Sequence, residues 1–191
     1  MKKFVLLFSL IMSAVVSTAQ TISYLGVPLS GNIETFTDKL ALKGALQNKK
    51  ISSKLEAGKR AFDITIFPYT CLGLVEYNPS TKNVFEGTLM FQISSTLDEF
   101  TNFMDNWSNQ VYDKYSKGIY TLEYEKYEYK TWPAAHYTIY STKNNLTIGN
   151  IYIYMDVKSY SKQSDAGNFM LHVMYRNYEA PCFEQQAQQY F

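Results

Sequence analysis

Apolar and polar side chains alternate without a break in residues 151–158. The apolar set is Ile151, Ile153, Met155 and Val157, and the other set is Tyr152, Tyr154, Asp156 and Lys158. Successive side chains of a strand point to opposite faces, so this segment predicts a strand with only one face buried. Such a strand requires partners beside it and a cover for its apolar face. It therefore favours a largely antiparallel sheet covered on one side.

Strand patterns also fill much of the remaining chain. Phe62, Ile64 and Ile66 alternate with polar residues in the first half. Eleven of the 17 tyrosines lie between Tyr120 and Tyr178, and this density favours strands.

Two segments have the spacing of helices. Thr96 and Glu99 form a capping box, and an apolar stripe follows at helical spacing up to a stop at Gly118. The stripe consists of Leu97, Phe100, Met104, Trp107 and Val111. A shorter helix is predicted over 33–43, ending at Gly44.

The order of helix, strands, helix and strands predicts an α+β domain. We expect a largely antiparallel sheet with two main helices packed on one face. The two halves, 30–94 and 95–178, are candidates for degenerate copies of one unit, although no residue-level repeat is visible.

The first nineteen residues have the layout of a secretory signal peptide. Lys2 and Lys3 precede an apolar run, and Ser17-Thr18-Ala19 places small residues before Gln20. We therefore expect residues 1–19 to be removed and 20–191 to form one exported domain, periplasmic or extracellular. No later apolar run reaches the roughly 20 residues that a spanning helix needs.

The charge balance argues against a nucleic acid as partner. The chain has 18 Lys and Arg against 17 Asp and Glu, with Lys2 and Lys3 in the expected leader. A near-neutral domain without a basic cluster lacks the positive surface that binds phosphate backbones.

The two cysteines, Cys71 and Cys182, leave two interpretations open. In an oxidising compartment they form a candidate disulfide; otherwise they are two separately buried thiols. The sequence lacks Cys-x-x-Cys and His-x-x-x-His spacings, and we expect no metal site and no cofactor.

The start of the expected mature chain resembles a known group of sequences. Residues 24–31, Tyr-Leu-Gly-Val-Pro-Leu-Ser-Gly, are followed by Phe36, Leu40 and Lys43-Gly44. This opening resembles that of small, uncharacterised exported proteins of Gram-negative gut anaerobes. The resemblance implies a bacterial exported α+β protein and supplies no activity.

Catalytic motifs are not evident in the sequence. His136 and His172 lie in strand patterns without a local partner at catalytic spacing. Glu123 and Glu125 share a strand face, but Lys126 and Lys130 are interleaved with them, as on a solvated face. Serine-hydrolase and nucleotide-binding motifs are missing. We therefore lean against an enzyme.

Tyrosines are the unusual chemical feature of this chain. We select Tyr152, Tyr154, Tyr137 and Tyr140 as candidate binding residues, because tyrosine combines contact area with a polar tip. Ordinary cross-strand pairing is the alternative interpretation. The preferred hypothesis is a non-catalytic domain that binds a protein, peptide or glycan through its sheet. The other is an envelope hydrolase whose site is assembled from residues distant in sequence.

Overall fold

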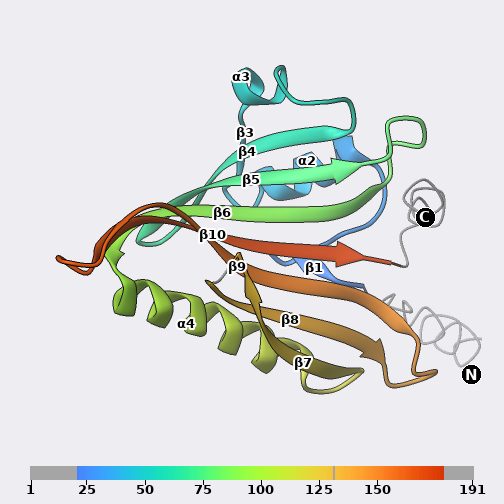
Figure 1. Ribbon diagram of the computed structural model, residues 1–191. Helices are drawn as coiled ribbons and strands as arrows, with labels where there is room; N and C mark the ends of the chain where they lie inside the picture. The colour runs from blue at the N-terminus through green and yellow to red at the C-terminus, as the bar shows by residue number, and fades with distance from the viewer. Residues whose placement is uncertain (1–20, 131, 179–191) are drawn as a thin grey trace, which may run out of the picture.

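The computed structural model describes residues 21–130 and 132–178. The expected leader, 1–19, and Cys182 lie outside these residues. The described chain is dominated by one eight-stranded antiparallel sheet with few helices (Figure 1). The α+β class with a mostly antiparallel sheet is therefore confirmed.

The sheet has the strand order β3-β4-β5-β6-β10-β9-β8-β7. Its strands are β3 (Leu46–Gln47), β4 (Lys59–Ile66), β5 (Tyr69–Tyr77), β6 (Val84–Thr96), β7 (Tyr120–Tyr129), β8 (Trp132–Ser141), β9 (Thr147–Ser161) and β10 (Ala166–Asn177). Strands β3 to β6 lie side by side in chain order, and so do β7 to β10. The two sets meet where β6 pairs with β10, from Ala166↔Thr96 to Arg176↔Glu86. This central pairing joins the two halves of the chain into one sheet.

The alternation in 151–158 appears in β9 as the sequence predicts. Ile151, Ile153 and Met155 are buried, whereas Tyr152 and Tyr154 are partly exposed. We call the face that carries the buried set the inner face. The side that carries Tyr152 and Tyr154 is the outer face.

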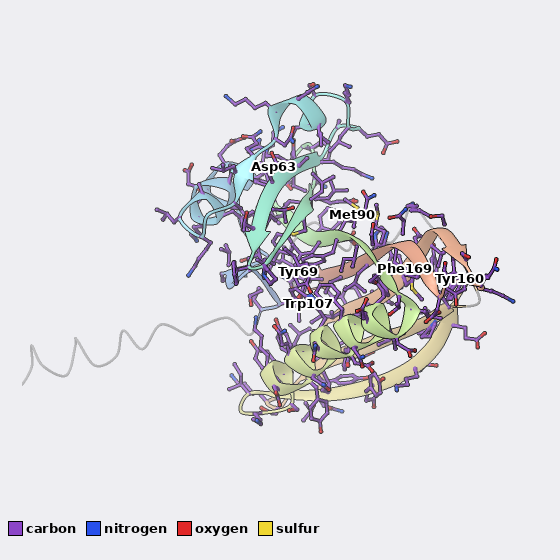
Figure 2. The ribbon with its side chains drawn as sticks, turned by 90° about the vertical axis from the view of Figure 1, so that its left-hand side faces the viewer. Asp63, Tyr69, Met90, Trp107, Tyr160 and Phe169 are labelled. Carbon is purple, nitrogen blue, oxygen red and sulfur yellow. The ribbon has the colours of Figure 1, made fainter. Side chains whose placement is uncertain are left out.

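Helix α4 (Leu97–Tyr115) packs against the inner face and has the predicted capping box. The Thr96 hydroxyl accepts from the Glu99 amide, and the Glu99 carboxylate accepts from the Thr96 amide. Phe100 is fully buried and stacks near Phe169 of β10. Trp107 is only partly buried, because it lies at the margin of the stripe against Phe91, near the β4–β5 turn (Figure 2).

Two further helices lie in the first half. Helix α2 (Ile33–Ala41) begins at Asn32, whose side chain accepts from the Glu34 amide. Its buried side chains belong to the same apolar cluster as those of α4. Helix α3 (Lys49–Ser52) was not expected; Asn48 caps it and also donates to Asp63 on β4. Among the described residues, no helix combines the length and apolar character needed to cross a bilayer.

A small hairpin, β1 (Ser23–Tyr24) and β2 (Val27–Pro28), precedes α2 and contributes Tyr24 and Val27 to the core. Tyr24 is fully buried and donates its hydroxyl to the carbonyl of Thr88 at 3.1 Å. Its ring lies over two glycines of the sheet. A Cβ at Gly87 would be 2.6 Å from the ring, and one at Gly73 would be 2.5 Å from the hydroxyl oxygen. Gly87 thus makes room for the ring of Tyr24.

We predict that Gly87→Ala lowers the free energy of unfolding by about 1–3 kcal/mol, because the new methyl group collides with Tyr24. Tyr24→Ala should cost about 3–5 kcal/mol, the range for truncating a large buried aromatic side chain. In the Tyr24→Ala background, Gly87→Ala should lower the free energy of unfolding only slightly, because the ring that the new methyl group would meet is gone. Urea unfolding of the wild type, the two single variants and the double variant measures this double-mutant cycle. An equal cost of Gly87→Ala in both backgrounds would show that the collision is not its cause.

Candidate functional site

Strand register sets the arrangement of aromatic side chains on the outer face. Tyr152 of β9 pairs with His136 of β8, and Tyr154 pairs with His172 of β10. The His136 and Tyr152 rings are stacked, with centroids 4.4 Å apart and planes 4° apart. The Tyr154 and His172 rings repeat this geometry at 4.6 Å and 4°. These contacts are cross-strand pairs of the kind that stabilise antiparallel sheets.

A small residue extends this arrangement to the edge strand. Ala134 of β8 is the register partner of both Tyr127 on β7 and Tyr154 on β9. Because its side chain is only a methyl group, Tyr129 of β7 reaches across β8 to Tyr154, with ring centroids 4.8 Å apart. We call Tyr129, His136, Tyr152, Tyr154 and His172 the aromatic row.

An acid and a lysine lie at one end of the aromatic row. Asp156 Oδ2 is 3.3 Å from His172 Nε2, and Asp156 Oδ1 accepts from Lys130 Nζ at 3.1 Å. Partial burial of Asp156 opposes ionisation, but the hydrogen bond and charge of Lys130 outweigh it and lower the pKa of that carboxyl. Burial lowers the pKa of His172 despite the nearby carboxylate. Burial also raises the pKa of Tyr154 to about 12, so its hydroxyl stays protonated.

The four candidate tyrosines do not form one surface. Tyr152 and Tyr154 lie together in the aromatic row. Tyr137 points to the inner face and is only 2% exposed; its hydroxyl bonds to the Ser108 hydroxyl and donates to the Ser108 carbonyl at 3.1 Å. Tyr137 therefore anchors α4 and is removed from the candidate binding surface. Tyr140 donates to Glu123 of β7 at 2.6 Å and does not join the row.

The candidate disulfide falls partly outside the described residues, because Cys182 is not among them. Cys71 is buried and has no disulfide partner within the described part of the chain. Burial raises the pKa of its thiol to about 12. A thiol of this kind is not a thiolate at neutral pH and is a poor nucleophile.

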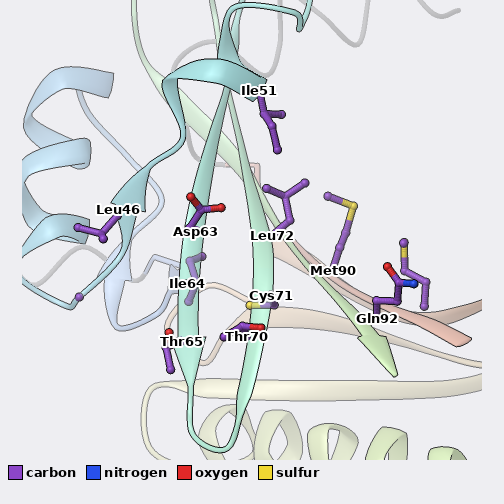
Figure 3. Close-up of a pocket in the computed structure, with 12 residues that line it drawn as sticks. Leu46, Ile51, Asp63, Ile64, Thr65, Thr70, Cys71, Leu72, Met90 and Gln92 are labelled. Atoms are coloured by element: carbon purple, nitrogen blue, oxygen red, sulfur yellow. The ribbon is translucent and has the colours of Figure 1, made fainter. Parts of the chain in front are cut away.

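A hollow of about 570 Å³ lies beside the aromatic row on the outer face (Figure 3). Ile51 of α3, Leu72 of β5 and Met90 of β6 give it an apolar lining, together with Met170 of β10. Its polar lining includes Asp63, Thr65, Thr70 and Gln92. Met90 pairs in register with His172, so the hollow and the row are continuous.

The sequence reasoning missed this hollow, although one signal for it was present. On β6 the outer positions read Glu86, Thr88, Met90 and Gln92, and Met90 is the apolar exception. Leu72 is a second apolar residue at an outer position, paired with Met90. Large apolar side chains that lie together at outer positions of neighbouring strands indicate a surface that has a use beyond solvation.

A second arrangement on the outer face involves His136. His136 Nδ1 is 3.9 Å from Glu125 Oε2, and His136 Nε2 is 3.5 Å from the hydroxyl of Thr138. The order hydroxyl, imidazole, carboxylate is that of a hydrolytic triad, but both distances exceed the usual hydrogen-bond reach of about 2.6–3.2 Å. All three residues lie within paired strands, where backbone amides form hydrogen bonds with the neighbouring strands. Oxyanion donors are therefore not evident beside Thr138.

A metal-binding site is not evident in the part of the chain that the structure describes. Within residues 21–130 and 132–178, no group of three or more His, Cys, Asp and Glu side chains is placed to hold a metal ion. The pairs around His136 and His172 each contribute one imidazole and one carboxylate.

Comparison with known proteins returns no match: the chain matches no protein-family model, no curated protein and no solved structure. The functional argument therefore rests on the outer face itself.

We predict that His172 makes the protein less stable as the pH falls from about 6.5. The folded-state pKa of His172 lies below its unfolded value, so the unfolded chain binds the proton more readily. Stability is lost as the pH falls through the unfolded pKa, with a slope of at most about 1.4 kcal/mol per pH unit.

Urea unfolding of wild type and His172→Gln between pH 7.5 and 5 measures this effect as the difference between the two curves. Asp156→Asn should extend the loss to lower pH, because the carboxylate that favours the charged imidazole is removed. Parallel curves for wild type and His172→Gln would contradict the prediction.

Proposed function

We propose that this chain is an exported, non-catalytic protein that binds a protein, peptide or glycan partner through the outer face of its sheet. The observation that carries the proposal is the aromatic row, in which three tyrosines and two histidines of four adjacent strands gather on one partly exposed surface. Tyrosine provides large contact area at low conformational cost, and its hydroxyl bonds to many partners.

The proposal includes a finer description of the fold. We infer that α2 and α4 both cover the inner face and that the halves are degenerate copies. In support, each half contains a helix followed by four strands of the sheet, and the last strands of the two halves pair as β6 and β10. Covering the inner face leaves the outer face free to bind.

Secretion is a further part of the proposal. The basic start, apolar run and small residues of 1–19 support export, and the resemblance of residues 24–44 supports a bacterial envelope as the setting. Expression of the full chain in a Gram-negative host should give an exported form that starts at Gln20, allowing for cyclised glutamine. N-terminal sequencing measures this; an exported form that still starts at Met1 would overturn the leader assignment.

The binding proposal predicts the behaviour of two double variants. Tyr152→Ala with Tyr154→Ala should abolish capture of the envelope partner, because it removes both rings that β9 contributes to the aromatic row. Tyr152→Phe with Tyr154→Phe keeps the stacked rings and should keep most of the stability, so it separates the hydroxyls from the packing. Capture by the tagged mature protein, followed by mass spectrometry, is the readout.

The same experiment needs a check that the variants remain folded. The ring contacts alone predict a loss of stability of about 1.5–4.5 kcal/mol for the alanine pair, since it removes three aromatic pairs and each contributes about 0.5–1.5 kcal/mol beyond area burial. Tyr112→Ala, on the exposed side of α4 with 53% of the residue accessible, is the control and should capture normally. A folded alanine pair that still captures its partner would show that the aromatic row is not the binding site.

An envelope hydrolase is the second candidate. The line Thr138, His136 and Glu125 favours it through the order of its groups, although these residues come from the adjacent strands β7 and β8 and not from distant parts of the sequence. The long distances and the backbone amides committed to the ladder weigh against it. Hydrolysis of p-nitrophenyl esters and glycosides that disappears in His136→Gln would support this candidate over binding.

A further inference from the structure

The geometry of the aromatic row discriminates between partner classes, on the assumption that the outer face binds as proposed above. A sugar ring packs its C–H groups on the face of an aromatic ring, where the quadrupole is negative. In the row, each ring contacts at least one neighbouring ring, and Tyr154 lies between two rings. Tyr154 contacts His172 towards β10 and Tyr129 towards the opposite side, and Tyr152 is stacked on His136.

The stacked rings therefore present edges and polar tips, not faces. A tyrosine hydroxyl both donates and accepts hydrogen bonds, which suits the amide and carbonyl groups of a polypeptide. Tyr152 Oη accepts from Asn150 Nδ2 at 2.9 Å and also shares a hydrogen bond with the side chain of Tyr178. The row thus complements a peptide backbone better than a sugar ring.

The hollow supplies the apolar half of the same surface. Its volume of about 570 Å³ lies within the range of ligand sites, about 300–1,000 Å³. Met90 and Met170 line it beside Leu72, and methionine side chains adapt their shape to different apolar guests. Leu46 of β3, 68% exposed, extends the apolar lining to the sheet edge.

Three carboxylates lie around this surface, and each has a hydrogen-bond partner within the protein. Asp63, in the lining of the hollow, accepts both Asn48 hydrogen bonds at 3.0 Å. Asp156 is held by Lys130, and the buried Glu86 is held by Arg176 at 2.7 Å. The carboxylates around this surface are therefore already engaged within the protein.

We propose that the outer face binds a polypeptide segment, and that one large apolar side chain of this segment enters the hollow while its backbone meets the hydroxyls of the aromatic row. The hollow and the row are adjacent through the register pair Met90 and His172. An extended segment that crosses β6, β10 and β9 reaches both, because neighbouring strands are about 4.8 Å apart.

The test is selection from a random peptide library displayed on phage, alongside a glycan array, with the mature protein as bait. The selected peptides should share a large apolar residue. Leu72→Lys and Leu72→Gln place a charged or polar group in the hollow and should weaken these peptides about tenfold or more. Leu146→Lys makes the same change in the β8–β9 turn, where Leu146 is 62% exposed, and should leave the affinity unchanged.

Methyl-labelled methionine spectra confirm the location. The Met90 and Met170 methyl signals should shift with peptide, while those of Met104 and Met155, buried in the core, should not. These two core signals also report whether Leu72→Lys remains folded.

The outcomes separate this inference from the proposed function. Glycan binding that requires Tyr152 and Tyr154 would keep the function and overturn the polypeptide partner. Peptides that lose affinity for the tyrosine pair but not for Leu72→Lys would overturn the role of the hollow. Peptides that bind every variant equally would overturn both proposals, and a selection that returns no peptide would overturn the polypeptide partner.

Discussion

The pairing of β6 with β10 is the constraint on which the rest of this structure depends. It joins two four-strand runs along a ladder from Thr96 and Ala166 to Glu86 and Arg176. Without it, each run would expose a long edge of unpaired amides and carbonyls. At the end of this ladder the buried Glu86 accepts from Arg176, and burial still raises the pKa of Glu86 despite that charge. The ion pair belongs to the seam between the halves, where removal of Arg176 would leave a buried carboxylate unpaired.

The central pairing also determines what each face can do. In a continuous antiparallel sheet the two faces are fixed by alternation, so every residue that points away from α4 contributes to one surface. The inner face closes over Phe100, Tyr24 and their neighbours, which removes it from recognition. The outer face gathers residues from strands far apart in sequence, including Met90 from the first half and Tyr154 from the second. A binding surface made in this way depends on register, and a slip of one residue would bury the aromatic row.

Much of this fold is predictable from local patterns, and the failures have identifiable physical causes. The capping box of α4 and the alternation of β9 are local signals, and both predictions are confirmed. Tyr137 and Tyr140 are three residues apart on one strand, so alternation alone places them on opposite faces; grouping them disregarded it. The burial of Tyr24 depends on Gly73 and Gly87, two distant glycines, and Trp107 is partly exposed because of its place beside the β4–β5 turn. The hollow requires α3 to pack against β4, a contact that no local pattern encodes.

The two edges of the sheet are poorly suited to pairing with a further strand. Strand β7 is ten residues long and its outer edge lies at the end of the sheet, yet Glu123, Glu125, Lys126 and Glu128 put charges on both of its faces. Charged side chains on an edge strand oppose pairing with another strand, because they would be brought together and desolvated. The other edge, β3, has only two residues. Extension of the sheet is thus disfavoured at both ends. The aromatic row and the hollow, in contrast, present half-buried apolar groups, and the carboxylates beside them are already hydrogen-bonded within the protein. A partner that covers them gains apolar burial without the cost of breaking an ion pair.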